Sequence, residues 1–237
     1  MYSNGLPGIA LITLVLGLSA CHDPYHDSYY HYDKGYVTSG EYQYINYSFD
    51  PYETYRVVLD TYSGDADVAV YNEHGELVVF SDEYSTRTDE VIFTAGNVNY
   101  QVEIYGNIDS EYDFYIEKLP YYDTGLNTDT DGIEFNIDIN AFTGDNYSIL
   151  ASKSFQVSHE YDLLTITPSP DPVWLDVTPT GIIYASPGND SATVSVNILE
   201  TASPSTADYA SVIVRAEDYS GKVNIFKEVE IIYRVIN

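Results

Sequence analysis

The feature that most constrains the fold is a succession of short runs in which apolar and polar residues alternate, from residue 35 to the end of the chain. Such alternation puts the apolar side chains on one face of an extended strand, and no useful helical period appears beside it. Clusters of turn residues, such as Ser63-Gly64-Asp65 and Gly106-Asn107, separate the runs about every ten residues. The pattern predicts an all-β protein built from antiparallel sandwiches.

The alternation falls into two stretches, residues 35–120 and 133–237, with the polar segment 121–132 (YYDTGLNTDTDG) between them. A chain of 237 residues is long enough for two domains of ordinary size. We therefore predict two tandem antiparallel β-sandwich domains joined by a linker over residues 121–132.

The N-terminus carries the signature of export. Residues 6–18 (LPGIALITLVLGL) form an uncharged apolar run of 13 residues, which suits the core of a signal peptide and is too short to span a membrane. The sequence Leu18-Ser19-Ala20-Cys21 directly follows and resembles the lipobox of bacterial lipoproteins. The alternative is an ordinary signal peptide followed by a free cysteine.

The lipobox resemblance implies that residues 1–20 are a signal peptide and that the Cys21 thiol carries acyl chains such as palmitate, so that lipid anchors the protein to the membrane. His22, rather than aspartate, follows the cysteine, which favours the bacterial outer membrane and leaves the leaflet open. Residues 21–34 are predicted as the lipidated cysteine and a flexible tether. The histidines of this segment, His22, His26 and His31, suggest a metal tract, but a solvated spacer is the favoured interpretation.

The first domain resembles a known family in three stretches: SGDADVAVY at residues 63–71, YQVEIYG at 100–106 and YDFYI at 112–116. Together they resemble the bacterial pre-peptidase C-terminal domain. The resemblance implies a jelly-roll-like sandwich that accompanies secreted hydrolases without being catalytic itself. In that family the domain serves secretion, solubility or substrate attachment, and some members bind collagen or polysaccharide.

The second domain resembles the BACON and related Ig-like repeats of bacterial surface proteins. The stretches that carry the resemblance are VWLDVTPTG at residues 173–181, TVSVNI at 193–198 and YASVIV at 209–214. The resemblance implies an Ig-like sandwich that binds carbohydrate or spaces other modules. Trp174 is expected in its core, because Ig-like sandwiches commonly pack one tryptophan between their sheets.

Residues 127–132 (NTDTDG) offer the opening of a calcium loop, with oxygen ligands at alternate positions and a glycine at the sixth. Asn127, Asp129, Asp131 and Asp138 would be the ligands. Aspartate replaces the usual glutamate at the twelfth position, however, and a strand pattern follows where a helix should begin. The same residue types make ordinary turns, so calcium stays one of two interpretations, and no cofactor is required.

No motif pairs a nucleophile with a base, and carboxylates are too abundant for any pair of them to be informative. The histidines beyond the tether, His74 and His159, are predicted as surface or capping residues. We therefore predict a protein that is not an enzyme, with a hydrolase as a minor alternative.

The chain has 26 tyrosines, and five of them crowd the start of the first domain: Tyr42, Tyr44, Tyr47, Tyr52 and Tyr55. Flat amphipathic rings exposed along a sheet would form a stacking surface for sugars or protein partners. The alternative is that these rings fill the core of a small sandwich.

Acidic residues outnumber basic ones by 37 to 9, which gives a net charge of −28. This balance excludes nucleic acid as a partner, because binding to phosphates requires cationic side chains. The sequence thus predicts a non-enzymatic cell-envelope lipoprotein whose sandwiches bind polysaccharide or an envelope protein. A structural or assembly accessory without a ligand of its own is the alternative.

Overall fold

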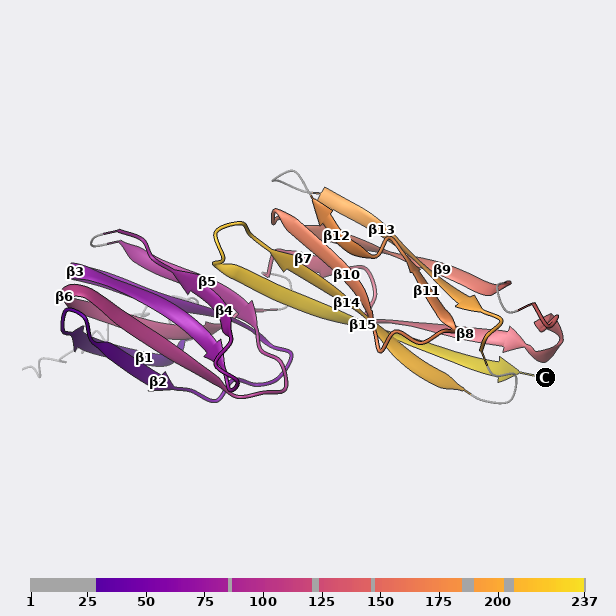
Figure 1. Ribbon diagram of the computed structural model, residues 1–237, viewed down its shortest axis with the longest axis horizontal. Helices are drawn as coiled ribbons and strands as arrows, with labels where there is room; N and C mark the ends of the chain where they lie inside the picture. Colours follow the sequence, from indigo (N-terminus) through magenta and orange to yellow (C-terminus); the bar gives the residue numbers. More distant parts are fainter. Residues whose placement is uncertain are drawn as a thin grey trace, which may run out of the picture.

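The computed structural model of the protein describes residues 29–84, 87–120, 124–145, 148–184, 190–202 and 207–236. The predicted signal peptide, Cys21, His22 and His26 lie outside these residues. Within the described ranges, no helix combines the length and the apolar character that crossing a membrane requires. Figure 1 shows two β-rich bodies placed end to end along the longest axis of the molecule.

The protein is all-β, with two sandwich domains, as the alternation predicts. The strands of the first domain are β1 (Tyr29–Val37), β2 (Tyr42–Asn46), β3 (Thr54–Asn72), β4 (Leu77–Ser81), β5 (Thr88–Thr94) and β6 (Tyr100–Lys118). Those of the second are β7 (Leu126–Thr128), β8 (Gly132–Asp138), β9 (Ile149–His159), β10 (Leu163–Ser169), β11 (Leu175–Thr178), β12 (Gly181–Tyr184), β13 (Asp190–Leu199), β14 (Asp208–Glu217) and β15 (Val223–Ile236). A short 3-10 turn, Ile139–Ala141, follows β8.

Two long strands organise the first sandwich. β3 and β6, of 19 residues each, pair antiparallel along nearly their whole length. One half of this pair carries β5 and β1 at its edges, and the other half carries β4 and β2. The two halves thus form two four-stranded layers that share β3 and β6, and the core lies between them.

The alternation of the sequence explains this core. Val57 and Leu59 of one half face Val68 and Val70 of the other within a single cluster of buried side chains. Between the halves the register of β3 against β6 slips three times, from Thr61 to Ala66. The segment Ser63-Gly64-Asp65, which the sequence suggested as a turn between strands, is therefore a corner inside one strand.

The second sandwich packs the sheet β8-β15-β14-β10-β12 against the four-stranded sheet β11-β13-β9-β7. Its Ig-like core contains Trp174, which is 5% exposed and whose ring centroid lies 4.8 Å from that of Tyr233. The prediction for Trp174 is confirmed. His159, the last residue of β9, is only 3% exposed, so it is not a surface residue.

The two segments predicted to lack regular structure, the tether 21–34 and the linker 121–132, each contain residues of a strand. β1 begins at Tyr29, inside the predicted tether, and pairs with β6, while His31 packs its ring against Tyr47 and Phe114. β7 lies inside the predicted linker and pairs with β9. The first sandwich therefore includes residues from 29 onward, and the second includes β7. Backbone pairing holds both strands, and alternation of aliphatic residues did not indicate it.

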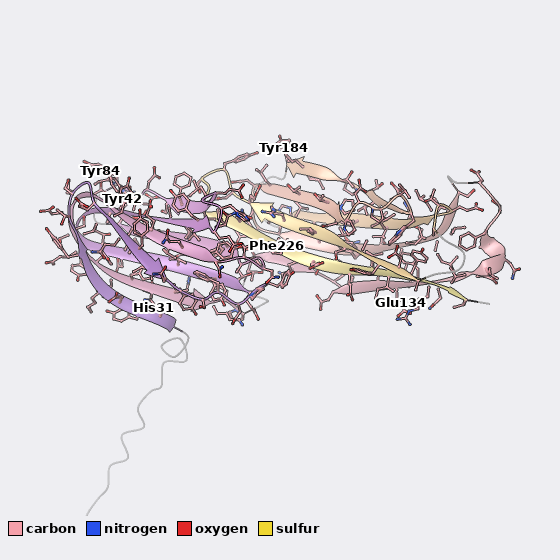
Figure 2. The ribbon with its side chains drawn as sticks, turned by 60° about the horizontal axis from the view of Figure 1, so that its bottom comes forward. His31, Tyr42, Tyr84, Glu134, Tyr184 and Phe226 are labelled. Atoms are coloured by element: carbon pink, nitrogen blue, oxygen red, sulfur yellow. The ribbon has the colours of Figure 1, made fainter. Side chains whose placement is uncertain are left out.

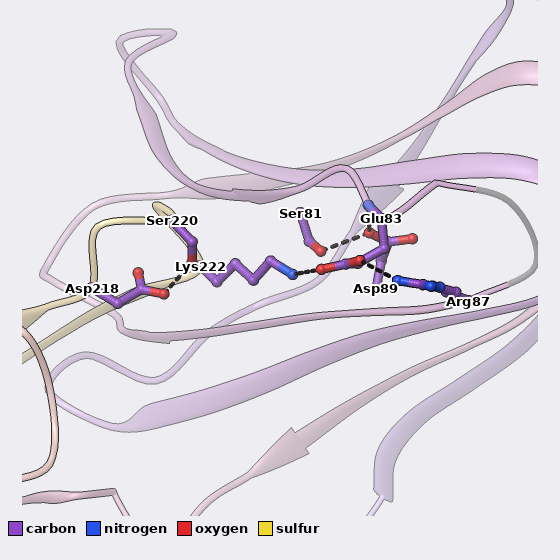
Figure 3. A network of polar contacts seen from close by, with 7 residues as sticks. All are labelled: Ser81, Glu83, Arg87, Asp89, Asp218, Ser220 and Lys222. Atoms are coloured by element: carbon purple, nitrogen blue, oxygen red, sulfur yellow. Dashed lines mark hydrogen bonds and ion pairs between the residues drawn. The ribbon is translucent and has the colours of Figure 1, made fainter. Parts of the chain in front are cut away.

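The two domains share one continuous sheet, because β15 of the second pairs with β5 of the first. The turn before β15 reaches the first domain: the Phe80 amide donates to the Gly221 carbonyl at 3.1 Å, and the Ile92 amide donates to the Lys222 carbonyl at 2.8 Å. Figure 3 shows Lys222 extending to the Glu83 carboxylate, with which it forms an ion pair. These contacts join the sandwiches into one elongated body.

Candidate ligand-binding face

The candidate site lies on the outer side of the layer formed by β2, β6, β3 and β4. Core residues such as Val68 and Val102 point inward, so their neighbours in the alternation point outward. The strand register places Tyr42 beside Tyr105, and Tyr105 beside Asp67. The outward residues that we call the tyrosine face are Tyr42, Tyr44, Asp67, Tyr71, Phe80, Glu103 and Tyr105.

The rings of this face lie close together while remaining accessible. The ring centroids of Tyr42 and Tyr105 are 4.7 Å apart. Those of Tyr42 and Tyr44 are 6.4 Å apart, with only 12° between the ring planes. Tyr42 is 51% exposed and Tyr44 is 52% exposed, and Figure 2 shows Tyr42 at the surface of the first sandwich. Two strands thus present adjacent flat rings to solvent.

Two hollows indent the surface of the face. The first hollow, of about 220 Å³, is lined by Tyr42, Asp67, Tyr71, Phe80, Asp82, Glu103 and Tyr105, among others. The second hollow is lined by Tyr44, Asn46, Asn72, Asn99, Gln101 and further residues. Tyr71 and Glu103 line both hollows. An extended molecule lying on the face would therefore pass these two side chains.

Carboxylates give the face a negative character. Burial, together with the carboxylates of Asp89, Asp65 and Asp82, raises the pKa of Asp67 to about 6, against the opposing effect of the Asn107 amide, which donates to Asp67 Oδ2 at 2.8 Å. Burial also raises the pKa of the Tyr71 hydroxyl, with a contribution from the Glu103 carboxylate. Asp67 is therefore a half-buried acid that burial and the surrounding carboxylates make harder to ionise.

Of the five predicted ligand-binding tyrosines, only Tyr42 and Tyr44 belong to this face. Tyr55 is 1% exposed and its hydroxyl accepts a hydrogen bond from the Asp50 amide at 2.9 Å. Tyr47 packs against Phe49 and Tyr55 on the first core. Its place in the alternation is that of Ile45 and not that of Tyr42 and Tyr44, so Tyr47 lies on the core side.

Tyr52 lies at the junction between the domains instead. Its ring centroid is 6.3 Å from that of Phe226, the residue that Figure 2 labels between the two sandwiches. Tyr52 also has a φ of 66°, in the left-handed region.

Sequence reasoning missed Tyr71 and Tyr105, although a signal for both exists. Each occupies the outward position of an alternating run, at the ends of ADVAVY and VEIY. Their proximity to Tyr42 follows only from the register of β2, β6 and β3, which sequence spacing does not reveal.

The predicted calcium ligands are not brought together in the structure. Asp129 Oδ1 accepts a hydrogen bond from the Gln156 amide at 2.8 Å, and Asp138 Oδ1 accepts one from the Asn140 amide at 2.8 Å, at the two ends of the segment. The extended strand β8 separates Asp131 from Asp138, a path of roughly 20 Å. Asn127 lies in β7. Across the described ranges, no three histidine, cysteine, aspartate or glutamate residues are grouped in a way that could hold a metal ion. Calcium binding stays a prediction.

No protein-family model matches the chain, and no curated protein matches it. Among solved structures, the periplasmic chaperone SfaE aligns at 14% identity and a TM-score of 0.36, covering 48% of this chain and 59% of that one. The E. coli chaperone DraB aligns at 12% identity and a TM-score of 0.33, covering 46% and 54%. The Bacillus licheniformis lipase BlEst2 in propeptide form aligns at 8% identity and a TM-score of 0.30, covering 97% of this chain and 43% of that one. This chain thus spans less than two thirds of each, and such low similarity assigns neither family nor function.

Proposed function

We propose that the protein is a non-enzymatic, lipid-anchored component of the bacterial outer membrane that binds polysaccharide through the tyrosine face. The observation that carries the proposal is the gathering of Tyr42, Tyr44, Tyr71 and Tyr105 from three strands over two hollows. Tyrosine rings pack against the apolar faces of sugar rings, and side-chain carboxylates and amides bond to sugar hydroxyls. The face supplies both kinds of group.

Packing alone does not account for these rings. The first core is filled by inward residues such as Val70, Val102 and Ile104 without Tyr42 or Tyr44. Exposed apolar surface that gathers in one place, rather than being scattered, is typical of an interaction site. The continuous junction between the sandwiches is compatible with a role as a spacer. A spacer role alone, however, does not explain why the exposed tyrosines cluster on one face.

The anchoring part of the proposal rests on Cys21 and the lipobox sequence. Because β1 begins at Tyr29, residues 22–28 would lie between the lipid and the first sandwich. A Cys21→Ser variant is expected to leave the membrane fraction, and mass spectrometry of the wild type is expected to find acyl chains on the N-terminal peptide. A variant that stays with the membrane and keeps an acylated peptide would refute the anchor.

Affinity electrophoresis of residues 22–237 through gels containing envelope polysaccharides tests the binding proposal. At least one polysaccharide is expected to retard the wild type, and Tyr42→Ala is expected to weaken that retardation about tenfold or more, since a central aromatic contact contributes about 2 kcal/mol. Tyr184→Ala is the matched control, because Tyr184 is 72% exposed but lies on β12 of the second domain.

Circular dichroism must show that both variants are folded. Equal retardation of the wild type and Tyr42→Ala by every polysaccharide, or retardation by none, would reject the tyrosine face as a glycan site.

A further inference from the structure

The charge of the tyrosine face restricts which glycan it can take. Asp67, Asp82 and Glu103 line the first hollow, and Glu73 lines the second together with Glu103. Among the described residues, neither hollow has a lysine or arginine in its lining. Any charged group entering the face therefore meets carboxylates and no cation of the face itself.

The rings reinforce this preference. The face of an aromatic ring carries negative electrostatic potential, so a tyrosine ring attracts an ammonium group placed over it. Tyr42, Tyr71 and Tyr105 surround the first hollow with the carboxylates of Asp67 and Glu103. An ammonium group in this hollow would have rings and carboxylates on several sides at once.

An anionic glycan meets the opposite situation. Each of its carboxylates or sulfates would approach the like charges of the face, on a protein whose net charge is −28. A neutral glycan could still stack on the rings but would gain nothing from the carboxylates beyond ordinary hydrogen bonds.

We propose that the tyrosine face selects glycans that carry free amino groups, with the ammonium held between the rings and the carboxylates of the first hollow. This inference rests on the proposed function and adds the substrate class. Tyr42 and Tyr44, with 12° between their ring planes, add two near-parallel rings beside the first hollow.

Glu103 is the residue on which selectivity should depend most. It lies between the two hollows and lines both, on β6 between the strands that carry Tyr44 and Ala69. Asp67, whose Oδ2 accepts a hydrogen bond from the Asn107 side-chain amide at 2.8 Å, supplies another carboxylate to the first hollow. Replacing Glu103 by glutamine keeps the size and hydrogen bonding of the side chain while removing its charge.

The experiment compares two tetrasaccharides of the same length and linkage, a tetramer of glucosamine and the same tetramer fully N-acetylated. Binding to residues 22–237 is measured by isothermal titration calorimetry at near-neutral pH and physiological salt, which screens long-range attraction. The wild type is expected to bind the free amine at least about tenfold more tightly, a difference of about 1.4 kcal/mol.

Three variants separate the sources of that preference. Glu103→Gln is expected to lose most of the preference, because it should weaken binding of the glucosamine tetramer more than binding of the acetylated tetramer. Tyr42→Ala is expected to weaken binding of both tetramers. Glu160→Gln is the matched control, because this exposed acid of the second domain lies outside both hollows and its loss changes the net charge equally.

The possible failures are distinguishable. Equal affinity for both tetramers, with loss of both in Tyr42→Ala, would overturn the selectivity and leave the glycan site standing. Equal effects of Glu103→Gln and Glu160→Gln would also overturn it, because the preference would then reflect net charge alone. If pentalysine bound with the same dependence on Tyr42 and Glu103 while neither tetramer bound, the ligand class would be peptide. If neither tetramer and no polysaccharide bound, the proposed function itself would fail.

Discussion

At the scale of single residues, Asp67 shows how a residue of the tyrosine face lowers the stability of the folded state at neutral pH. Its folded pKa of about 6 lies above the value near 4 expected in an unfolded chain. The folded state therefore holds more protons than the unfolded state between pH 4 and pH 6, and the contribution of Asp67 to stability is lost as the pH rises through 6. A half-buried carboxylate kept at such a position is typical of a binding site.

The Asp67→Asn variant tests this linkage. Asparagine keeps an oxygen that accepts from Asn107 and removes the charge, so we expect the free energy of unfolding at pH 7 to rise by about 1 kcal/mol, allowing for solvent screening. At pH 4 the difference should vanish, since the wild-type aspartate is protonated in the folded state. Urea unfolding at both pH values measures it.

The exposed Asp171 offers a comparison, and Asp171→Asn should change stability little at either pH. A stability gain for Asp67→Asn that is the same at pH 4 and pH 7 would show that burial of the charge is not its cause.

The tyrosines show why residues are harder to predict than strands. Alternation correctly puts Tyr42 and Tyr44 on one face of a strand, but it cannot say whether that face is the core, because tyrosine suits both environments. Tyr55 follows the same kind of pattern and is buried. Which face is covered depends on the partner layer, and that is decided by contacts between strands distant in the sequence.

At the scale of the element, the corner of β3 is the feature that permits the first sandwich to form from one pair of strands. Gly64 occupies it with a φ of 93°, and a Cβ there would lie 2.3 Å from the Asp109 carbonyl oxygen of β6. The Asp65 amide donates to Ser110 Oγ at 2.8 Å beside it. Glycine is needed both for its conformation and for the close approach of the two strands.

Gly64→Ala is therefore expected to destabilise the first sandwich by about 3 kcal/mol or more, from backbone strain plus the clash. Gly40→Ala isolates the backbone strain, because Gly40 has a φ of 77° and a Cβ added there would meet nothing within 4 Å, so its cost should be about 1 kcal/mol. Thermal unfolding of both variants provides the comparison. Equal losses would mean that the corner does not depend on close packing.

The same corner explains a limit of sequence reasoning about elements. The strand-forming runs on either side of Ser63-Gly64-Asp65 are evident from alternation, yet the segment itself resembles an ordinary turn. Glycine and aspartate favour turns and bulges alike, so local composition does not distinguish a hairpin from a bend within one strand. Gly106-Asn107 has the same ambiguity and lies inside β6.

At the scale of the whole molecule, the junction connects the second domain to the candidate site of the first. Gly221, in the turn before β15, accepts a hydrogen bond from the Phe80 amide and lies against the Phe80 ring. Phe80 also lines the first hollow of the tyrosine face. Ile92 of β5 packs on the core of the second domain, so the contact is not confined to one residue. The two sandwiches should therefore unfold together, and the second should influence glycan binding without touching the glycan.

Gly221→Ala tests this coupling. A Cβ at Gly221 would lie 2.6 Å from Phe80 Cε1, and the φ of 80° adds backbone strain, so the Phe80 ring, which lines the first hollow, must shift. We expect calorimetry to show one unfolding transition in the wild type and two in the variant, together with weaker binding of the glycan that the wild type binds. Gly144→Ala provides the control, because Gly144 has a φ of 88° with nothing within 4 Å of the added carbon, the Phe80 ring included. It should lower stability by about 1 kcal/mol and leave glycan binding unchanged. If Gly221→Ala behaved like Gly144→Ala in both measurements, the junction would be a passive contact and the tyrosine face would belong to the first sandwich alone.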